Sequence, residues 1–180
     1  LWYQGESNAH NIELHERLFN MLQRSWRAYW QRPDLPFYFV QLSSIATRPS
    51  WPHFRDSQRR LAETLPHTWM AVSSDLGDSL DIHPRHKREV SDRLVRSALA
   101  HTYGYRLCSS GPEYAGTVRE GKTLRLTFRH ADGLQAAGGA KELTGFEVAG
   151  SDGLFHAATA RIEGETIVVK NPEVSVPCAV

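Results

Sequence analysis

The sequence predicts an α/β protein in which a parallel sheet with flanking helices precedes a small antiparallel β-rich domain. Before Gly104, short apolar runs alternate with longer segments of helical periodicity, as they do in parallel βαβ units. After Gly104, frequent glycines separate short alternating runs, which is typical of antiparallel strands joined by tight turns. We place the boundary near residues 104–112, with an α/β domain over 1–107 and a β-rich, sandwich-like domain over 108–180.

The first expected helix runs from about Asn11 to Gln31. Its apolar residues follow the spacing of one helical stripe. They are Leu14, Leu18, Met21, Leu22 and Tyr29. An amphipathic helix buries such a stripe, so we expect these side chains in the core. Pro33 and Pro36 then end the helix, because proline lacks the N–H that a helix interior needs.

Two short runs, residues 37–42 and 68–73, are rich in aromatic and branched side chains and suit strands buried on both faces. A helix is expected between them, at about 53–64. A third helix is expected at about 84–101, where Pro84 occupies a tolerated first-turn position. Residues 1–4 form another apolar and aromatic run, and we expect the chain to begin inside a strand. These elements make part of a parallel sheet.

The expected β-rich domain contains runs in which apolar and polar residues alternate, for example 123–128 and 166–169. Such alternation indicates a strand, because successive side chains of a strand point to opposite faces of the sheet. Glycines between the runs favour tight turns. Several short strands of this kind indicate an antiparallel sheet.

The composition excludes two classes of partner. The 21 Lys and Arg residues are interspersed with 20 Asp and Glu residues, for a net charge of +1, so no basic stripe is available for phosphates. We therefore expect no nucleic acid partner. No run approaches the roughly 18–20 apolar residues of a membrane span, so we expect no membrane partner either.

The cysteines and histidines predict no metal site. Cys108 and Cys178 are too few for a disulfide framework and lack a CxxC spacing. They are either unpaired thiols or one bridge tying the chain end to residue 108. The histidines show no paired ligand spacing, so solvated or core positions are expected for them.

Polar loops at the carboxyl ends of parallel strands are the first place to look for a site. In the loop at 75–83, Asp81 precedes His83 by two residues. Asp81 could orient the imidazole and stabilise its charged form while the other ring nitrogen takes a proton from a nucleophile. The alternative is a helix cap beside an exposed histidine.

The loop at residues 4–8 offers two interpretations. Ser7 lies in a strand–turn–helix setting that loosely matches the nucleophile elbow G-x-S-x-G, although Ala9 replaces the second glycine. Gln4 and Asn8 instead carry side-chain amides, which can stabilise an oxyanion. The residues alone leave both interpretations open. Trp51, in a proline-rich loop, is the best candidate among the aromatics for stacking on a sugar ring.

Three blocks together carry a resemblance to a known family. They are WYQGESN at 2–8, DLGD at 75–78, and DIHP at 81–84 with Lys87. These blocks resemble those of sialate O-acetylesterases, within the SGNH-hydrolase superfamily. The similarity extends through the third expected helix and into the glycine-rich part. It implies a partial SGNH-hydrolase sheet of flavodoxin-like topology in the first domain.

The resemblance also implies roles for individual residues. His83 matches the catalytic base of the family, and Asp81 matches the acid that orients it. Gln4 falls in the block that supplies an oxyanion-hole side chain. The remaining matched positions would brace the site or contact substrate: Glu6, Asn8 and Asp75. No metal or organic cofactor is called for.

In this family the nucleophilic serine lies in a block well before WYQGESN, and this sequence has no counterpart of that block. The resemblance therefore disfavours Ser7 as nucleophile. The expected function is removal of O-acetyl groups from sialic acid or related sugars by a Ser-His-Asp mechanism, with the missing N-terminal half of the same enzyme as partner. The alternatives are a non-catalytic carbohydrate-binding or structural fragment, and an autonomous esterase using Ser7. The resemblance favours a secreted, periplasmic or lysosomal location.

Overall fold

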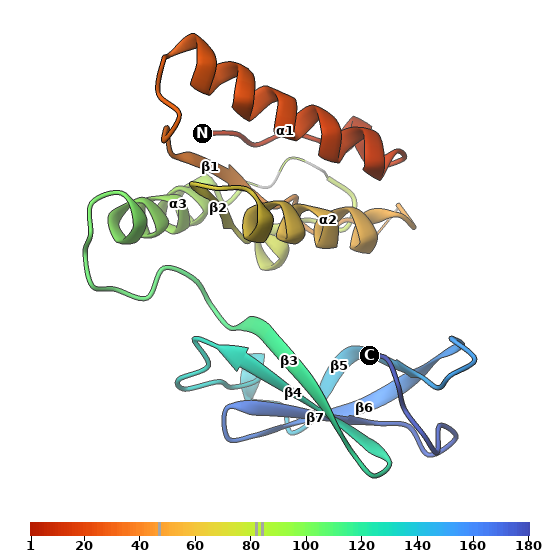
Figure 1. The fold of residues 1–180 in the computed structure, drawn as a ribbon. Coiled ribbons are helices and arrows are strands. Elements are labelled where there is room, and N and C mark those ends of the chain that lie inside the picture. The colour runs from red at the N-terminus through yellow and green to blue at the C-terminus, as the bar shows by residue number, and fades with distance from the viewer. Residues whose placement is uncertain (47, 82, 84) are drawn as a thin grey trace. The chain divides into compact units, whose positions relative to one another are not determined.

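The computed structural model describes residues 1–46, 48–81, 83 and 85–180, which form two compact units, Leu1–Ser110 and Gly111–Val180. Figure 1 shows helices around a small sheet in the first unit and mainly strands in the second. The first unit contains a parallel sheet, and the second contains a five-stranded antiparallel sheet. The predicted fold class is therefore confirmed.

The first unit is built on strand β1 (Phe37–Val40), which pairs in parallel with β2 (Thr68–Ala71). On the other side of β1, the Trp2 N–H donates to the Tyr38 carbonyl at 2.9 Å, and the Val40 N–H donates to the Trp2 carbonyl at 3.0 Å. This bridge is also parallel. The chain at Trp2, β1 and β2 therefore all run the same way, so their carboxyl ends lie at one edge.

Helices cover both faces of β1, and all four of its residues are therefore buried. Phe37 and Phe39 pack in one cluster with Phe19 of α1 (Ile12–Tyr29) and Leu61 of α2 (Trp51–Thr64). On the opposite face, Val40 packs with Val90 of α3 (Lys87–His101). The pattern of a strand buried on both faces is thus met.

The predicted buried stripe of α1 is wrong. Its fully buried residues are His15, Phe19 and Gln23, whereas Leu14 and Leu18 are each 46% exposed. The predicted stripe also contains Met21 and Tyr29, which are exposed, and Leu22, which is partly buried. The helix turns a different face to the sheet because Phe19 packs on β1, Gln23 accepts from Thr68, and the His15 ring packs against Phe54. The hydrophobic pattern did not predict burial of His15 and Gln23, because both side chains are polar.

Buried side-chain amides bind the strands of the first unit. The Thr68 hydroxyl donates to Gln23 Oε1 at 2.9 Å. The Leu42 N–H, just after β1, donates to Gln58 Oε1 of α2 at 3.0 Å. Gln23 and Gln58 are both 1% exposed. Each bond satisfies an amide oxygen that water cannot reach, whereas Nε2 of Gln23 is buried without a partner among the described residues.

The second unit is a single antiparallel sheet with strand order β3-β4-β7-β6-β5. The strands are β3 (Glu113–Glu120), β4 (Thr123–Arg129), β5 (Leu143–Ala149), β6 (Phe155–Glu163) and β7 (Thr166–Lys170). Leu124, Val148 and Val169 lie at the centre of its core, each 2% exposed or less. After β7 the chain returns to β5, where the Ala149 N–H donates to the Ala179 carbonyl at 3.0 Å.

Cys108 and Cys178 are both free and exposed. Within the described residues, none of the helices combines the length and the apolar character needed to cross a bilayer. Three observed helices differ in extent from those expected: α1 is shorter at both ends, α2 begins at Trp51, and α3 begins at Lys87. Pro84, expected in the first turn of the third helix, lies outside the described residues.

The two faces of α1 are expected to respond differently to truncation. Phe19→Ala should destabilise the first unit by about 3–5 kcal/mol, because it leaves a cavity between α1 and β1. Leu14→Ala should change stability by less than about 1 kcal/mol, because Leu14 is half exposed. All five tryptophans lie in the first unit, so urea unfolding followed by tryptophan fluorescence measures that unit alone. Equal losses in both variants would contradict the observed helix orientation.

Candidate functional site

The carboxyl ends of the parallel strands carry a cluster of joined loops. A 3₁₀ turn at Glu6–Asn8 follows the parallel bridge at Trp2, and another at Ser74–Leu76 follows β2. The Ser73 hydroxyl donates to the Gln41 carbonyl at 2.7 Å, which joins the loops after β1 and β2. The Arg48 guanidinium donates to the Glu6 carbonyl and so joins the loop after β1 to the first turn. The loops expected to hold the site are thus held as one group.

Gly5 makes the first of these turns possible. Its φ of 139° lies where other residues are strained. A Cβ at this position would also lie 3.1 Å from Phe54 Cζ and 3.3 Å from His15 Cε1. The Gly5 N–H donates to Glu6 Oε2 at 2.9 Å, so the Glu6 carboxylate braces this turn. The turn leaves Gln4 and Ser7 exposed.

Gly77 has the same function in the loop after β2. A Cβ there would lie 2.6 Å from the Ser44 carbonyl oxygen and 2.8 Å from the Ser44 nitrogen. Backbone atoms cannot move aside as a flexible side chain can, so only glycine allows this approach. The contact, together with the Ala46 N–H bond to the Ser79 carbonyl at 3.0 Å, packs the loop at 73–80 against the loop after β1.

Asp75 forms a bidentate ion pair with Arg93 of α3. The two guanidinium nitrogens Nη1 and Nη2 of Arg93 each lie 2.6 Å from one carboxylate oxygen. Arg93 Nη1 also donates to the Val72 carbonyl at 2.7 Å. The hydrogen bonds from Arg93 lower the pKa of Asp75, which therefore stays ionised. Asp75 ties the end of β2 to α3, and Arg93 is a part of this site that the sequence did not single out.

Asp81 and His83 form a second pair, in which the histidine is exposed. The His83 backbone N–H donates to Asp81 Oδ1 at 2.8 Å, and His83 Nδ1 lies 3.3 Å from the same oxygen. The backbone bond is the main reason why the pKa of Asp81 is lowered, with the nearby imidazole also contributing. The His83 side chain is 81% exposed. Ile82 and Pro84 of this block lie outside the described residues.

This geometry suits a general base. A carboxylate at Nδ1 favours the tautomer with its proton on Nδ1, which leaves Nε2 free to accept a proton. In the described residues no hydrogen bond joins Ser7 to His83. The exposed pair therefore joins a carboxylate to an imidazole, and among the described residues no serine hydroxyl is bonded to that imidazole.

The block at residues 2–8 meets the start of α3. Lys87 Nζ lies 5.6 Å from the centroid of the Tyr3 ring, and Tyr3 packs against the cluster of Val40 and Val90. This contact links two of the three sequence blocks. Asn8 lies on the other side of its turn, where its Nδ2 is 3.5 Å from Nδ1 of the buried His15. Gln4, Asn8 and His15 all border a cavity of about 190 Å³ beside α1.

Trp51 does not offer a face to a sugar, so that expectation is wrong. Its side chain is 3% exposed, and its ring nitrogen donates to the Ser43 carbonyl at 2.7 Å. Proline-rich surroundings suggested a loop, but Trp51 is the first residue of α2 and packs beside Phe54 in the core. The Trp51 side chain thereby anchors the loop after β1 to the core.

Comparison with known proteins identifies the family. Residues 1–103 match the family model described as carbohydrate esterase, sialic acid-specific acetylesterase. The chain belongs to this family. The mouse sialate O-acetylesterase is 36% identical in an alignment of 134 residues, which covers 62% of this chain and 25% of the mouse protein. The rat sialate O-acetylesterase is 35% identical in an alignment of 152 residues, which covers 71% of this chain and 28% of the rat protein.

A solved relative matches nearly the whole chain. The crystal structure of a carbohydrate acetylesterase from Xanthomonas citri superposes with a TM-score of 0.89 at 35% identity, over 98% of this chain and 43% of that one. This chain therefore spans about a quarter of the length of its curated family relatives and less than half of the solved one. The matched residues of this chain, 1–103, include all three sequence blocks.

Gly77→Ala is expected to destabilise the first unit by about 1–3 kcal/mol, because the added methyl group overlaps the Ser44 backbone. Ser79→Ala is the control, since Ser79 is an exposed residue of the same loop in the first unit. Urea unfolding followed by tryptophan fluorescence measures both. A Gly77→Ala protein as stable as the control would show that the loop does not need this close approach.

The stability of the first unit is expected to fall in mild acid because of His15. Burial lowers the pKa of His15 below its usual value of 6.5. The unfolded chain therefore takes up this proton first, so the contribution is complete above about pH 6.5 and is lost as the pH falls toward the folded-state pKa. Urea midpoints at about pH 7.5 and 5.5 measure the loss. His15→Gln should reduce the difference, whereas His10→Gln, at an exposed position, should not.

Proposed function

We propose that this chain supplies the acid–base half of an esterase that removes O-acetyl groups from sialic acid or a related sugar. The observation that carries the proposal is the exposed Asp81–His83 pair at the carboxyl ends of the strands. Membership of the carbohydrate esterase family supports an acetylated sugar as substrate. The pair is the arrangement that a serine nucleophile from another segment would need.

In the proposed reaction, a serine outside these residues attacks the acetyl carbonyl carbon while His83 Nε2 takes the hydroxyl proton. Asp81 stabilises the imidazolium through Nδ1. The tetrahedral intermediate then breaks its bond to the sugar oxygen, which receives the proton from His83 and leaves as an alcohol. Water attacks the acetyl-serine, His83 takes one water proton and returns it to the serine oxygen, and acetate leaves.

Gln4 is proposed to stabilise the oxyanion. Gln4 is exposed just after the bridge at Trp2, and an N–H of its side-chain amide could donate to the negative oxygen of the intermediate. Asp75 and Glu6 act as positioning residues in this proposal, since one binds Arg93 and the other binds the Gly5 N–H. Asn8 is proposed to contact substrate or to brace the turn through His15.

The surface beside α1 supports a partner segment as the source of the serine. Leu14, Leu18 and Met21 form an exposed apolar stripe on that helix. The cavity next to the stripe, about 190 Å³, has mainly apolar walls. Its lining includes Trp2, Leu18, Phe19 and Leu22. A contiguous apolar surface of this kind commonly marks an interface, and here it adjoins the loop that carries Gln4.

A chimera tests the proposal. This chain replaces the matching part of the Xanthomonas citri acetylesterase, and hydrolysis of p-nitrophenyl acetate and of O-acetylated sialic acid is measured for the chain alone and for the chimera. We expect activity only in the chimera. His83→Ala should lower kcat by about 10³-fold or more, since the base is lost. His86→Ala is the control, because His86 is an exposed neighbour whose ring lies 3.2 Å from Glu89.

Two outcomes would contradict the proposal. An active chimera that is equally active with His83→Ala would remove His83 from the mechanism. Activity of the chain alone that is lost with Ser7→Ala would instead make Ser7 the nucleophile and the chain an autonomous esterase.

A further inference from the structure

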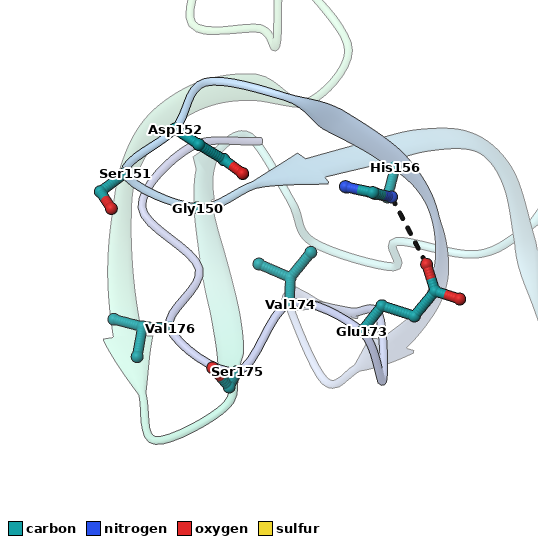
Figure 2. Close-up of a pocket in the computed structure, with 8 residues that line it drawn as sticks. All are labelled: Gly150, Ser151, Asp152, His156, Glu173, Val174, Ser175 and Val176. Carbon is teal, nitrogen blue, oxygen red and sulfur yellow. Dashed lines mark ion pairs between the residues drawn. The ribbon is translucent and has the colours of Figure 1, made fainter.

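The second unit contains a polar pocket that the esterase mechanism does not use. Figure 2 shows it between the turn at residues 150–152, His156 of β6, and the segment 173–176 that follows β7. Its volume is about 300 Å³, which lies at the lower end of small-molecule pockets. Val174 forms its floor, and carboxylate, imidazole and hydroxyl groups surround that floor.

Main-chain and side-chain bonds fix the walls of this pocket to the sheet. Asn171 donates from Nδ2 to the Ala157 carbonyl at 2.7 Å and accepts the Glu173 N–H at 2.6 Å. On the opposite wall, Asp152 Oδ1 accepts the Leu154 N–H at 3.2 Å. The side chains at 152 and 173 therefore start from anchored backbone. A ligand would lose little affinity to ordering these walls.

Gly150 keeps the pocket open. A Cβ at this position would stand 3.5 Å from Asp152 Oδ1, 3.6 Å from the Val176 carbonyl oxygen and 3.8 Å from Val174 Cγ1. A side chain larger than that of alanine would therefore occupy the space between the two walls. No steric contact requires glycine here. The absence of a side chain at this position instead keeps the space between the two pocket walls open.

The polar groups of the pocket match sugar hydroxyls. His156 Nδ1 lies 3.5 Å from Glu173 Oε2, which leaves the other carboxylate oxygen and the other ring nitrogen available. In Figure 2 the Asp152 carboxylate and the His156 imidazole point toward the space between them. Among the described residues, the hydroxyl groups of Ser151 and Ser175 have no protein partner. The set accepts several hydrogen bonds and donates others, as neighbouring hydroxyls of a sugar ring require.

The charge of the pocket selects against anions. Glu173 and Asp152 bring two carboxylates against one imidazole. A ligand carboxylate or phosphate would therefore meet like charge. A metal ion is also disfavoured, because in the described part of the chain no three His, Cys, Asp or Glu side chains converge as a metal would need. A neutral ligand with many hydroxyl groups fits these conditions.

We infer that this pocket binds a neutral sugar residue through its hydroxyl groups, with the C–H face of the ring on Val174 and Val176. Glu173 and Asp152 accept hydrogen bonds from the sugar, and His156 is held by Glu173 for a further bond. The site does not depend on esterase activity. In a carbohydrate esterase it would hold an uncharged unit of a glycan.

The test uses the 180-residue chain, labelled with ¹⁵N and titrated at about pH 7.5 with the methyl glycosides of glucose, galactose and N-acetylglucosamine. We expect at least one glycoside to shift the amide signals of 150–152, 156 and 173–176, with a dissociation constant of about 1–10 mM. N-Acetylneuraminic acid should bind at least about tenfold more weakly because of its carboxylate.

Three variants separate the site from the fold. Asp152→Asn and Glu173→Gln keep side-chain shape and should weaken binding at least about tenfold, and Gly150→Val should abolish it by filling the pocket. Glu165→Gln, at an exposed turn of the same sheet, is the control and should bind as the unchanged chain does. Amide spectra report whether each variant folds. Saturation without shifts at these residues, equal binding of N-acetylneuraminic acid, or shifts there with calcium chloride alone would overturn the inference.

Discussion

Strand β1 is hydrogen-bonded on both of its edges, and this central position organises the first unit. Trp2 pairs with one edge and β2 with the other, all in parallel. Because parallel strands end together, the loops that follow Trp2, β1 and β2 are brought to one side of the sheet. The helices then only need to cover the two faces of β1. The turn of Gly5, the loop of Gly77 and the pair of Asp81 and His83 all take their place from this arrangement.

The loops are held by contacts that differ in chemical kind. Gly5 and Gly77 contribute because they lack a side chain, so that neighbouring atoms can pack where a Cβ would lie. Asp75 acts through charge, since Arg93 binds both of its oxygens and also the carbonyl of Val72. His83 contrasts with these residues, because its ring is mostly solvent-exposed and contacts the Asp81 carboxylate. The packed loops therefore support an exposed histidine that lies beside a carboxylate.

Sequence reasoning succeeded where one signal dominated. The run Phe37–Val40 is apolar at every position, so a strand buried on both faces could be predicted without knowing its neighbours. The fold class followed from that pattern and from the glycine-rich turns.

Sequence reasoning failed on α1, because the buried face contains His15 and Gln23, whose burial depends on partners far away in the sequence. It failed on Trp51 for a related reason: a proline neighbour suggested a loop, while the ring fills the core beneath that loop. The spacing of Asp81 and His83 indicated a pair, but Arg93 emerged only from the fold, since nothing in a helical arginine marks the carboxylate it will meet.

The buried amides of Gln23 and Gln58 have a consequence for how the sheet is assembled. Each amide oxygen accepts from one particular group, the Thr68 hydroxyl or the Leu42 N–H. If a strand were to pair one residue out of step, its side chains would exchange faces and these oxygens would lose their partners in a place without water. A purely apolar core would tolerate such a slip more readily, because apolar contacts have little directional preference. The two glutamines therefore act as checks on strand alignment, and they make the correct order of the sheet easier to distinguish from its near alternatives during folding.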